Sequence, residues 1–296
     1  MRRWSFTKGH GTENDFVVLL DRESMLEIGP AEVRFICDRR AGIGADGLLR
    51  AVLAKHVDGW DGDGGLWFMD YRNADGSIAE MCGNGIRVFV RFLLEQGLVS
   101  GPTVDIATRG GRRAATVLPD GRIRVSMGPA TIGDHWVVVT TVDGTDFKAL
   151  TAEVGNPHAV SFVDDLDRFS LHAAPRWDPL EEFPKGVNLE FVRHLGPRHI
   201  SMRVFERGVG ETRSCGTGTV AAAAVARALD QDQTPLPVTY RVDVPGGTVE
   251  VELTEIDAYL TGPAVLVAHG ELALPDRATL EPHIPNSTAS GASRPA

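Results

Sequence analysis

Short apolar stretches rich in β-branched residues recur along the whole chain, and turn residues such as Pro119-Asp120-Gly121 separate many of them. This pattern predicts β-strands. The expected strands cover Phe16–Leu20, Leu66–Met69, Thr103–Ala107, Trp136–Thr141, His158–Val163, Val187–Val192, Ser201–Phe205 and Thr248–Leu253. Helical spacing or a run of alanines predicts helices over Pro30–Arg40, Asn84–Glu95 and Thr217–Leu229. We therefore expect an α+β protein with more strand than helix.

One motif occurs twice, each time directly before a predicted helix. Cys82 begins Cys-Gly-Asn-Gly, and Cys215 begins Cys-Gly-Thr-Gly. Each copy also has a polar residue nine positions before the cysteine and, farther upstream, an asparagine just before a strand: Asn73 and Asn14 in the first copy, Glu206 and Asn156 in the second. Matched features in the same order indicate a duplicated chain. The two halves then supply one cysteine each.

The glycines of this motif have a chemical consequence. They let the backbone turn tightly and present free N–H groups at the start of a helix. Such a helix start carries partial positive charge, which attracts a carboxylate and lowers the pKa of a thiol. If the two halves face each other, one thiolate can remove a proton from a carbon beside a carboxylate, and the other thiol can return one to the opposite face. The motif predicts racemisation or epimerisation without a cofactor.

Charge and composition limit the binding partners, the cellular location and the kinds of site that we expect. The 296 residues carry a formal net charge of −10 and contain no run rich in Lys or Arg, which disfavours nucleic acid and anionic membranes as partners. The longest apolar run, Val220–Ala226, is far shorter than the ~20 residues of a membrane span. No apolar segment follows the basic start, so we expect a cytoplasmic protein. The wide spacing of three cysteines and nine histidines indicates neither a disulfide framework nor a metal site.

Several longer blocks resemble the diaminopimelate epimerase family. They are HGTENDF (His10–Phe16), RRAGIGADG (Arg39–Gly47), YRNADGSIAEMCGNGIR (Tyr71–Arg87), VGNPH (Val154–His158), GVNLEFV (Gly186–Val192) and VFERGVGETRSCGTGT (Val204–Thr219). The resemblance implies interconversion of LL- and meso-2,6-diaminopimelate, a bacterial step toward lysine and peptidoglycan, by a homodimer. It also implies two pseudo-symmetric α/β halves, each a strand-rich sheet around a central helix, with the active site in the cleft between them. We expect the first half to cover 1–128 with 265–280 returning to it, the second 129–264, and a flexible tail 281–296.

The resemblance also implies residue roles. Cys82 and Cys215 resemble the two acid/base thiols, and His158 and Glu206 are expected nearby, where they bias thiol protonation. The helix-start groups that hold the reacting carboxylate would be Gly83, Asn84, Gly216 and Thr217. The polar shell for the amino groups and the distal carboxylate would be Asn14, Asn73, Asn156, Asn188, Glu206 and Arg207. Some members have a glutamine where this chain has Gly47, so a contact from that position is not carried over.

Other interpretations remain open at this stage. Cys37 lies beside Ile36 on an apolar helix face and is expected to be a packing residue. A proline or hydroxyproline racemase would share the two-thiol logic, although the many amide and arginine positions indicate a substrate with two charged ends. A thiol hydrolase would need one cysteine with a histidine and leaves the second motif unexplained. An amino acid-binding protein would bind its ligand without exchanging hydrogen with solvent.

Overall fold

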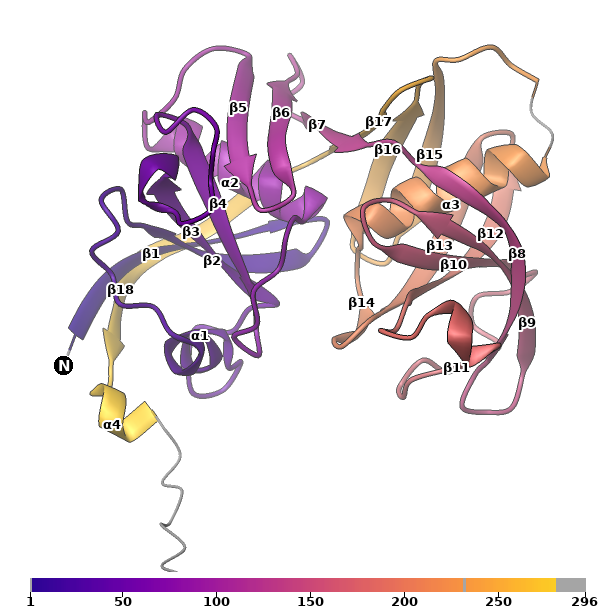
Figure 1. Cartoon of the computed structure of the whole chain (residues 1–296), viewed down its shortest axis with the longest axis horizontal. Coiled ribbons are helices and arrows are strands. Elements are labelled where there is room, and N and C mark those ends of the chain that lie inside the picture. The colour runs from indigo at the N-terminus through magenta and orange to yellow at the C-terminus, as the bar shows by residue number, and fades with distance from the viewer. Residues whose placement is uncertain (1, 231–232, 281–296) are drawn as a thin grey trace, which may run out of the picture.

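A computed structural model describes residues 2–230 and 233–280, so the predicted tail 281–296 lies outside the described residues. The chain forms two strand-rich halves, side by side in Figure 1. The first half contains β1 (Arg2–Gly11), β2 (Asn14–Leu20), β3 (Gly47–Leu53), β4 (Trp67–Asn73), β5 (Thr103–Thr108), β6 (Gly111–Val117), β7 (Ile123–Gly128) and β18 (Val265–Leu274). The second contains β8 (Thr131–Thr140), β9 (Asp146–Glu153), β10 (Pro157–Phe162), β11 (Arg176–Asp178), β12 (Asn188–Gly196), β13 (His199–Glu206), β14 (Gly210–Thr212), β15 (Val238–Val244), β16 (Gly247–Leu253) and β17 (Ala258–Gly262).

The two halves have the same strand pairing. In the first, β1–β2 is antiparallel, β2–β3 parallel, β3–β4 antiparallel, β4–β5 parallel, and β5–β6–β7 antiparallel. In the second, β9–β10 is antiparallel, β10–β12 parallel, β12–β13 antiparallel, β13–β15 parallel, and β15–β16–β17 antiparallel. The predicted α+β duplication is therefore confirmed by the order of strand directions.

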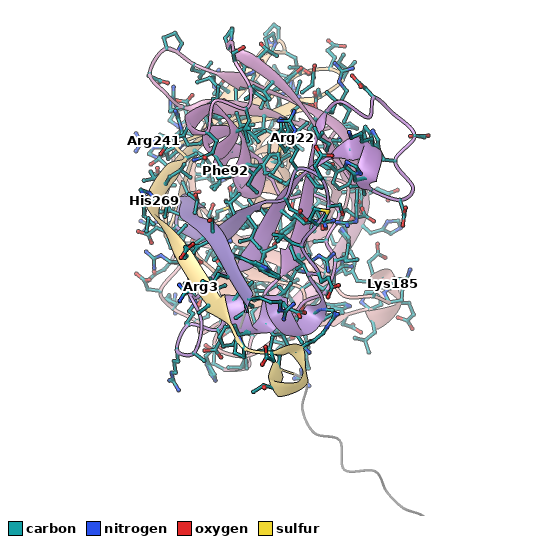
Figure 2. The ribbon with its side chains drawn as sticks, turned by 90° about the vertical axis from the view of Figure 1, so that its left-hand side faces the viewer. Arg3, Arg22, Phe92, Lys185, Arg241 and His269 are labelled. Carbon is teal, nitrogen blue, oxygen red and sulfur yellow. The ribbon has the colours of Figure 1, made fainter. Side chains whose placement is uncertain are left out.

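Two pairings tie the chain together. β7 and β17 pair in antiparallel fashion and join the sheets of the two halves. β18 returns from the far end of the sequence and lies antiparallel to β1, from Arg2↔Leu274 to His10↔Val265. Figure 2 shows this edge, with Arg3 and His269 along the two strands. The first half is thus closed by the last strand of the chain.

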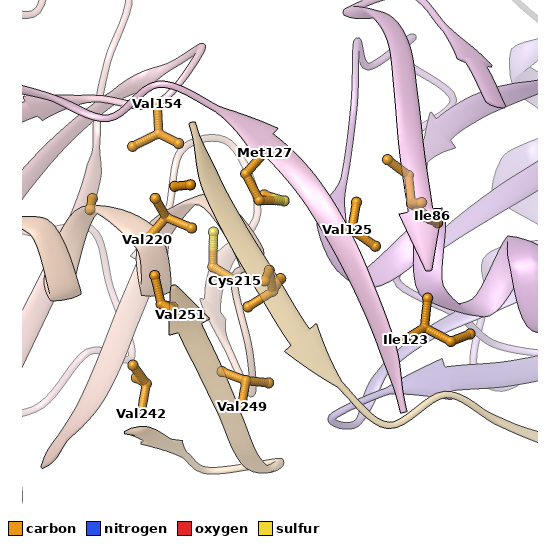
Figure 3. Packing of buried hydrophobic residues seen from close by; sticks show 14 of the residues in the cluster. Ile86, Ile123, Val125, Met127, Val154, Cys215, Val220, Val242, Val249 and Val251 are labelled. Atoms are coloured by element: carbon orange, nitrogen blue, oxygen red, sulfur yellow. The ribbon is translucent and has the colours of Figure 1, made fainter. Parts of the chain in front are cut away.

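Each half wraps its sheet around one helix: α2 (Gly83–Glu95) in the first and α3 (Gly216–Leu229) in the second. The residues of α3 from Gly216 to Ala226 are all buried, and α2 is buried continuously from Gly83 to Val90. α3 is accordingly apolar or small on all sides up to Ala226, whereas α2 keeps one polar stripe of Asn84, Arg87 and Arg91. The buried core runs from one half to the other, and Figure 3 shows Met127, Cys215 and Val220 packed where the halves meet. The two helix starts lie inside this joint.

The remaining elements are short. They are α1 (Pro30–Cys37), α4 (Arg277–Leu280) and two 3-10 turns, η1 (Ala54–His56) and η2 (Leu180–Glu182). The helix predicted over Pro30–Arg40 ends at Cys37, because the backbone of Asp38 is already extended. Cys37 packs with Val33 and Ile36 in a core of its own. No helix in the described part of the chain is long and apolar enough to cross a membrane.

Candidate active site

Both motif cysteines occupy the same structural position, the N-cap of a buried helix. Cys82 precedes α2 with φ −144° and ψ 117°, and Cys215 precedes α3 with φ −122° and ψ 119°. The Cys82 sulfur accepts a hydrogen bond from the Gly85 N–H at 3.4 Å, and the Cys215 sulfur accepts one from the Gly218 N–H, also at 3.4 Å. Each sulfur therefore takes the place that a serine or aspartate oxygen usually takes at a helix start.

The two helix starts meet at their first glycines. A Cβ atom built on Gly216 would lie 3.3 Å from the Gly83 Cα and 3.4 Å from the Asn84 nitrogen. A Cβ on Gly83 would lie 2.8 Å from the Met127 sulfur and 3.0 Å from a methyl group of Leu260. Glycine at both positions lets the N-termini of α2 and α3, each with its partial positive charge, converge on one region.

A cavity of about 140 Å³ opens at this convergence, with walls from both halves. The predicted site residues that line it are Asn14, Asn73, Cys82, Gly83, Asn156, Asn188, Glu206, Arg207, Cys215, Gly216 and Thr217. The structure thus brings together two thiols, two helix starts and a ring of amide, carboxyl and guanidinium groups. Among the described residues, no group of three or more His, Cys, Asp or Glu side chains is arranged to hold a metal ion.

The Asn84 side chain does not line this cavity. It is buried outside the cavity and donates to the Ser214 carbonyl oxygen at 3.0 Å and to Asn14 Oδ1 at 3.3 Å. Its own oxygen accepts a hydrogen bond from the buried Arg87 guanidinium at 2.8 Å. Only the Asn84 backbone is near the reacting groups, where its N–H helps to lower the pKa of Cys82. Asn84 therefore joins the start of α2 to the residue that precedes Cys215.

His158 also lies behind the cavity wall. Its ring is fully buried, with Nδ1 2.7 Å from Glu190 Oε1 and Nε2 2.9 Å from the side-chain oxygen of Asn156. Asn156 lines the cavity, so the histidine contacts the site through this amide. Glu190 is equally buried and lies close to Gly218, where an added Cβ would be 2.7 Å from its Oε1. The pair fixes the amide of Asn156 and places a carboxyl group under the start of α3.

Burial outweighs the helix starts in setting the thiol pKa values. Burial raises the pKa of Cys82 to about 12, and the backbone N–H groups of Gly85 and Asn84 offset this only in part. Burial likewise raises the pKa of Cys215 well above its usual value, and the carboxyl groups of Glu206 and Glu190 add to the effect. The helix starts lower the thiol pKa values as expected, but the net shift is upward, because desolvation of a thiolate costs more than the N–H groups return.

Glu206 is the titratable group poised near neutrality. Burial raises its pKa to about 7, and hydrogen bonds from Thr212 and Cys215 partly offset the rise. The Thr212 hydroxyl donates to Glu206 Oε1. A carboxyl group with this pKa can accept a proton from the Cys215 thiol and give it back at the pH of a cell.

The other wall side chains are held by their neighbours. Asn14 donates to Asp46 Oδ2 at 2.8 Å, and its oxygen accepts from the Cys82 thiol at 3.7 Å. The Asn188 oxygen accepts the backbone N–H of Arg207 at 2.9 Å, which ties β12 to the end of β13. The Arg207 side chain is exposed and lines the cavity, and its Nη1 donates to the Lys185 carbonyl oxygen at 3.5 Å.

Comparison with known proteins decides the family. The sequence model of the family described as diaminopimelate epimerase matches residues 6–133 and 150–267. The chain belongs to the diaminopimelate epimerase family. It is 50% identical to the diaminopimelate epimerase of Streptomyces coelicolor, with 94% of this chain and 98% of the relative covered. It is 48% identical to that of Corynebacterium glutamicum and 46% identical to that of Mycolicibacterium smegmatis, which cover 91% and 90% of this chain and 98% and 96% of the relatives.

Solved structures share the fold of this family member at low sequence identity. A PhzF-family phenazine biosynthesis protein from Bacillus anthracis has a TM-score of 0.69 at 16% identity and covers 93% of this chain and 100% of its own. A hydroxyproline epimerase from Agrobacterium vitis has a TM-score of 0.64 at 15% identity and covers 94% and 95%. These likenesses show that the duplicated architecture extends beyond diaminopimelate epimerases.

Some cavity groups of this family member were not expected from its sequence. They include Asp46, Tyr71, Met81, Thr212 and Ser214, which line the cavity, and Glu190, which lies behind it. The signal for Glu190 was a lone carboxylate inside the apolar strand Asn188-Leu-Glu-Phe-Val, because a buried charge needs a partner. Thr212 and Ser214 lie within three residues of Cys215 and carry no comparable signal of their own.

Proposed function

We propose that the protein is a cofactor-independent epimerase that interconverts LL- and meso-2,6-diaminopimelate with Cys82 and Cys215 as its two acid/base groups. The observation that carries this proposal is the pair of cysteines at matched helix N-caps, one from each half, on the wall of one cavity. Membership of the diaminopimelate epimerase family supports the substrate.

The reaction moves one proton off the substrate and another onto it. A thiolate at one cysteine takes the proton from Cα, which breaks the C–H bond and leaves its electron pair in the carbon–carboxylate unit. The thiol at the other cysteine gives its proton to the opposite face of the same carbon. One thiol and one thiolate remain with their positions exchanged, so the reverse reaction uses the same groups in swapped roles.

Thiolate formation needs help because burial raises both thiol pKa values. In its ionised form, Glu206 accepts the proton of Cys215 and so produces the thiolate on that side. On the other side, the nearby Arg87 guanidinium and the N–H groups of Gly85 and Asn84 favour negative charge at Cys82. Each thiol therefore has its own local means of ionisation.

The carbanion at Cα is stabilised where α2 and α3 converge. The charge that leaves the C–H bond spreads onto the carboxylate, and N–H groups aimed at those oxygens stabilise it most in a site closed to water. Gly83, Gly216 and Thr217 line the cavity at the two helix starts. They are placed to hold the reacting carboxylate, while the Asn84 side chain instead connects the halves.

The far end of diaminopimelate requires a second set of polar groups. Asn73, Asn156, Asn188 and Arg207 also line the cavity. Arg207 can pair with the distal carboxylate in a bidentate manner, and the amide oxygens can accept ammonium protons. A substrate with a single carboxylate would leave these groups unused, which favours diaminopimelate over proline.

Incubation with LL-diaminopimelate in heavy water tests the mechanism. The wild type should form meso-diaminopimelate and incorporate deuterium at the reacting carbon, and Cys82→Ala and Cys215→Ala should each lose epimerisation by at least about 1,000-fold. Cys37→Ala is the matched control, because this buried thiol at the end of α1 packs in a separate apolar core and does not line the cavity, and it should retain activity. Turnover near the wild-type rate in either motif variant would disprove the two-thiol mechanism. Racemisation of proline without turnover of diaminopimelate would disprove the substrate.

We also propose that the enzyme is a cytoplasmic homodimer, as its family resemblance implies. We further propose that 1–128 with 265–280, and 129–264, are its two folding units, a division supported by the β1–β18 pairing. Light scattering after size exclusion should give twice the 31.9 kDa chain mass. A mass of one chain at micromolar concentration would contradict the dimer.

A further inference from the structure

Tyr71 takes up the space beside Gly47 on the cavity wall. Gly47 lies on β3 opposite Asn73 of β4, and Tyr71 is two residues before Asn73 on the same face. A Cβ atom on Gly47 would lie 2.6 Å from the Tyr71 ring and 2.7 Å from the Arg72 carbonyl oxygen. The tyrosine ring and the Arg72 carbonyl oxygen therefore both exclude a side chain at position 47, the position where some relatives have a glutamine.

The Tyr71 ring is fixed, but its hydroxyl is left without a protein partner. The ring is 9% exposed and packs edge-on against Phe16, with centroids 5.9 Å apart and planes at 77°. The hydroxyl forms no hydrogen bond with any other residue of the described chain, and it is not fully buried. Because Tyr71 lines the cavity, its hydroxyl must face that space.

The surroundings keep this hydroxyl a hydrogen-bond donor. Burial raises the pKa of Tyr71 well above its usual value of 10, and the acidic groups of Cys82, Glu206, Asp46 and Cys215 add to the effect. The ring packs on Phe16, and a Cβ atom on Gly85, at the start of α2, would lie 3.6 Å from the Phe16 ring and 3.4 Å from the Cys82 Cβ, which places the tyrosine at the end of the cavity that holds Cys82. During the reaction, the hydrogen-bond acceptor that the substrate brings to this end of the cavity is the carboxylate beside the reacting carbon.

We propose that Tyr71 donates a hydrogen bond from its hydroxyl to the carboxylate of the reacting carbon, and so replaces a side-chain contact that Gly47 cannot make. The inference rests on the proposed epimerase function. Negative charge grows on this carboxylate as the Cα proton leaves, so the hydrogen bond strengthens toward the transition state. The hydroxyl should therefore contribute mainly to kcat.

Tyr71→Phe is the first test, since it removes the hydroxyl and keeps the ring. We expect kcat with LL-diaminopimelate to fall about 100-fold with less than a threefold change in KM, and the thermal unfolding midpoint to stay unchanged. Tyr259→Phe, on β17 away from the cavity, is the matched control and should behave as wild type. A kcat within twofold of wild type, or a change confined to KM, would overturn the proposal. An inactive wild type would instead contradict the proposed function, so the two failures are distinct.

Variants at Gly47 and Tyr71 test whether the Tyr71 ring occupies the space that a side chain at position 47 would need. Gly47→Gln alone should lower the unfolding midpoint, because its Cβ would meet the Tyr71 ring at 2.6 Å. Tyr71→Ala opens that space but loses the hydroxyl. The double variant Gly47→Gln/Tyr71→Ala should recover part of the midpoint relative to Gly47→Gln, since the contact with the Arg72 carbonyl oxygen remains, and raise kcat at least about tenfold above Tyr71→Ala, through the new amide donor. No recovery of either quantity would overturn the proposal.

Discussion

Replacement of Glu206 by glutamine should make the protein more stable at alkaline pH while it abolishes catalysis. Glu206 has a pKa of about 7 in the folded protein against 4.5 ordinarily, because it is buried. The fold thus favours the protonated form. The contribution of the Glu206 carboxyl group to folding stability is complete below pH 4.5 and is lost as the pH rises through 7, because the carboxyl group must then ionise in a buried place. Glutamine never ionises, and its oxygen can still accept the Thr212 hydroxyl.

The size of the effect follows from the two pKa values. The interval between them corresponds to about 3 kcal/mol of lost stability at pH 8, but only about 1 kcal/mol at pH 5. Between these pH values, the stability of Glu206→Gln relative to wild type should therefore increase by about 2 kcal/mol. In a chain of this size, that corresponds to roughly 5 °C in the unfolding midpoint.

Thermal unfolding of wild type and Glu206→Gln at half-unit steps from pH 5 to 8 measures this difference directly. Glu255→Gln, which changes an exposed carboxylate, is the control and should track wild type. The same samples should show no epimerisation by Glu206→Gln, because the Cys215 thiol has lost its proton acceptor. Parallel midpoint curves for wild type and Glu206→Gln would refute the claim that burial of this carboxyl group sets its pKa.

Further predictions concern the joint between the halves and the thiols. Wild-type kcat/KM should rise with pH as Glu206 ionises near pH 7, and a flat profile across that range would contradict its role as proton acceptor. Gly216→Ala should cost about 1–3 kcal/mol of stability and most of the activity, whereas Gly196→Ala, whose Cβ would meet nothing within 4 Å, should cost neither. Asn84→Ala should lower the free energy of unfolding by about 1–3 kcal/mol in denaturant titrations, because it leaves the Ser214 carbonyl and the Arg87 guanidinium short of a partner. Mild oxidation should link Cys82 to Cys215 and stop turnover, and a thiol reductant should restore it; permanent loss would speak against the disulfide.

The strands predicted from sequence and those missed differ in how they are buried. The apolar runs at β2, β10 and β12 are buried on both faces, so they are continuous in sequence. β1 alternates buried with more exposed residues, β18 is buried only at Leu272 and Leu274, both contain charges, and neither was predicted. Which strands pair was predictable only through the repeat, because parallel pairs such as β2–β3 join residues across long connections.

For the site, sequence predicted which residues gather but not where each side chain points. The duplicated motif identified both cysteines and the helix starts, since a Cys-Gly-x-Gly turn leads to one local geometry. Asn84 lies in that motif, yet its side chain turns away from the cavity toward Ser214, a residue of the other half. The thiol pKa direction was also beyond local reasoning, because it depends on burial by both halves together.

The pairing of β1 with β18 has a consequence for how the protein is made. Arg2 leaves the ribosome 272 residues before its partner Leu274. At roughly 5–20 residues per second, β1 waits on the order of tens of seconds for its neighbour. During synthesis the first half therefore exposes an unpaired strand edge, a liability for aggregation until β18 has been made. Chaperone dependence should accordingly fall in a circular permutant that begins at residue 265 and joins β18 to β1.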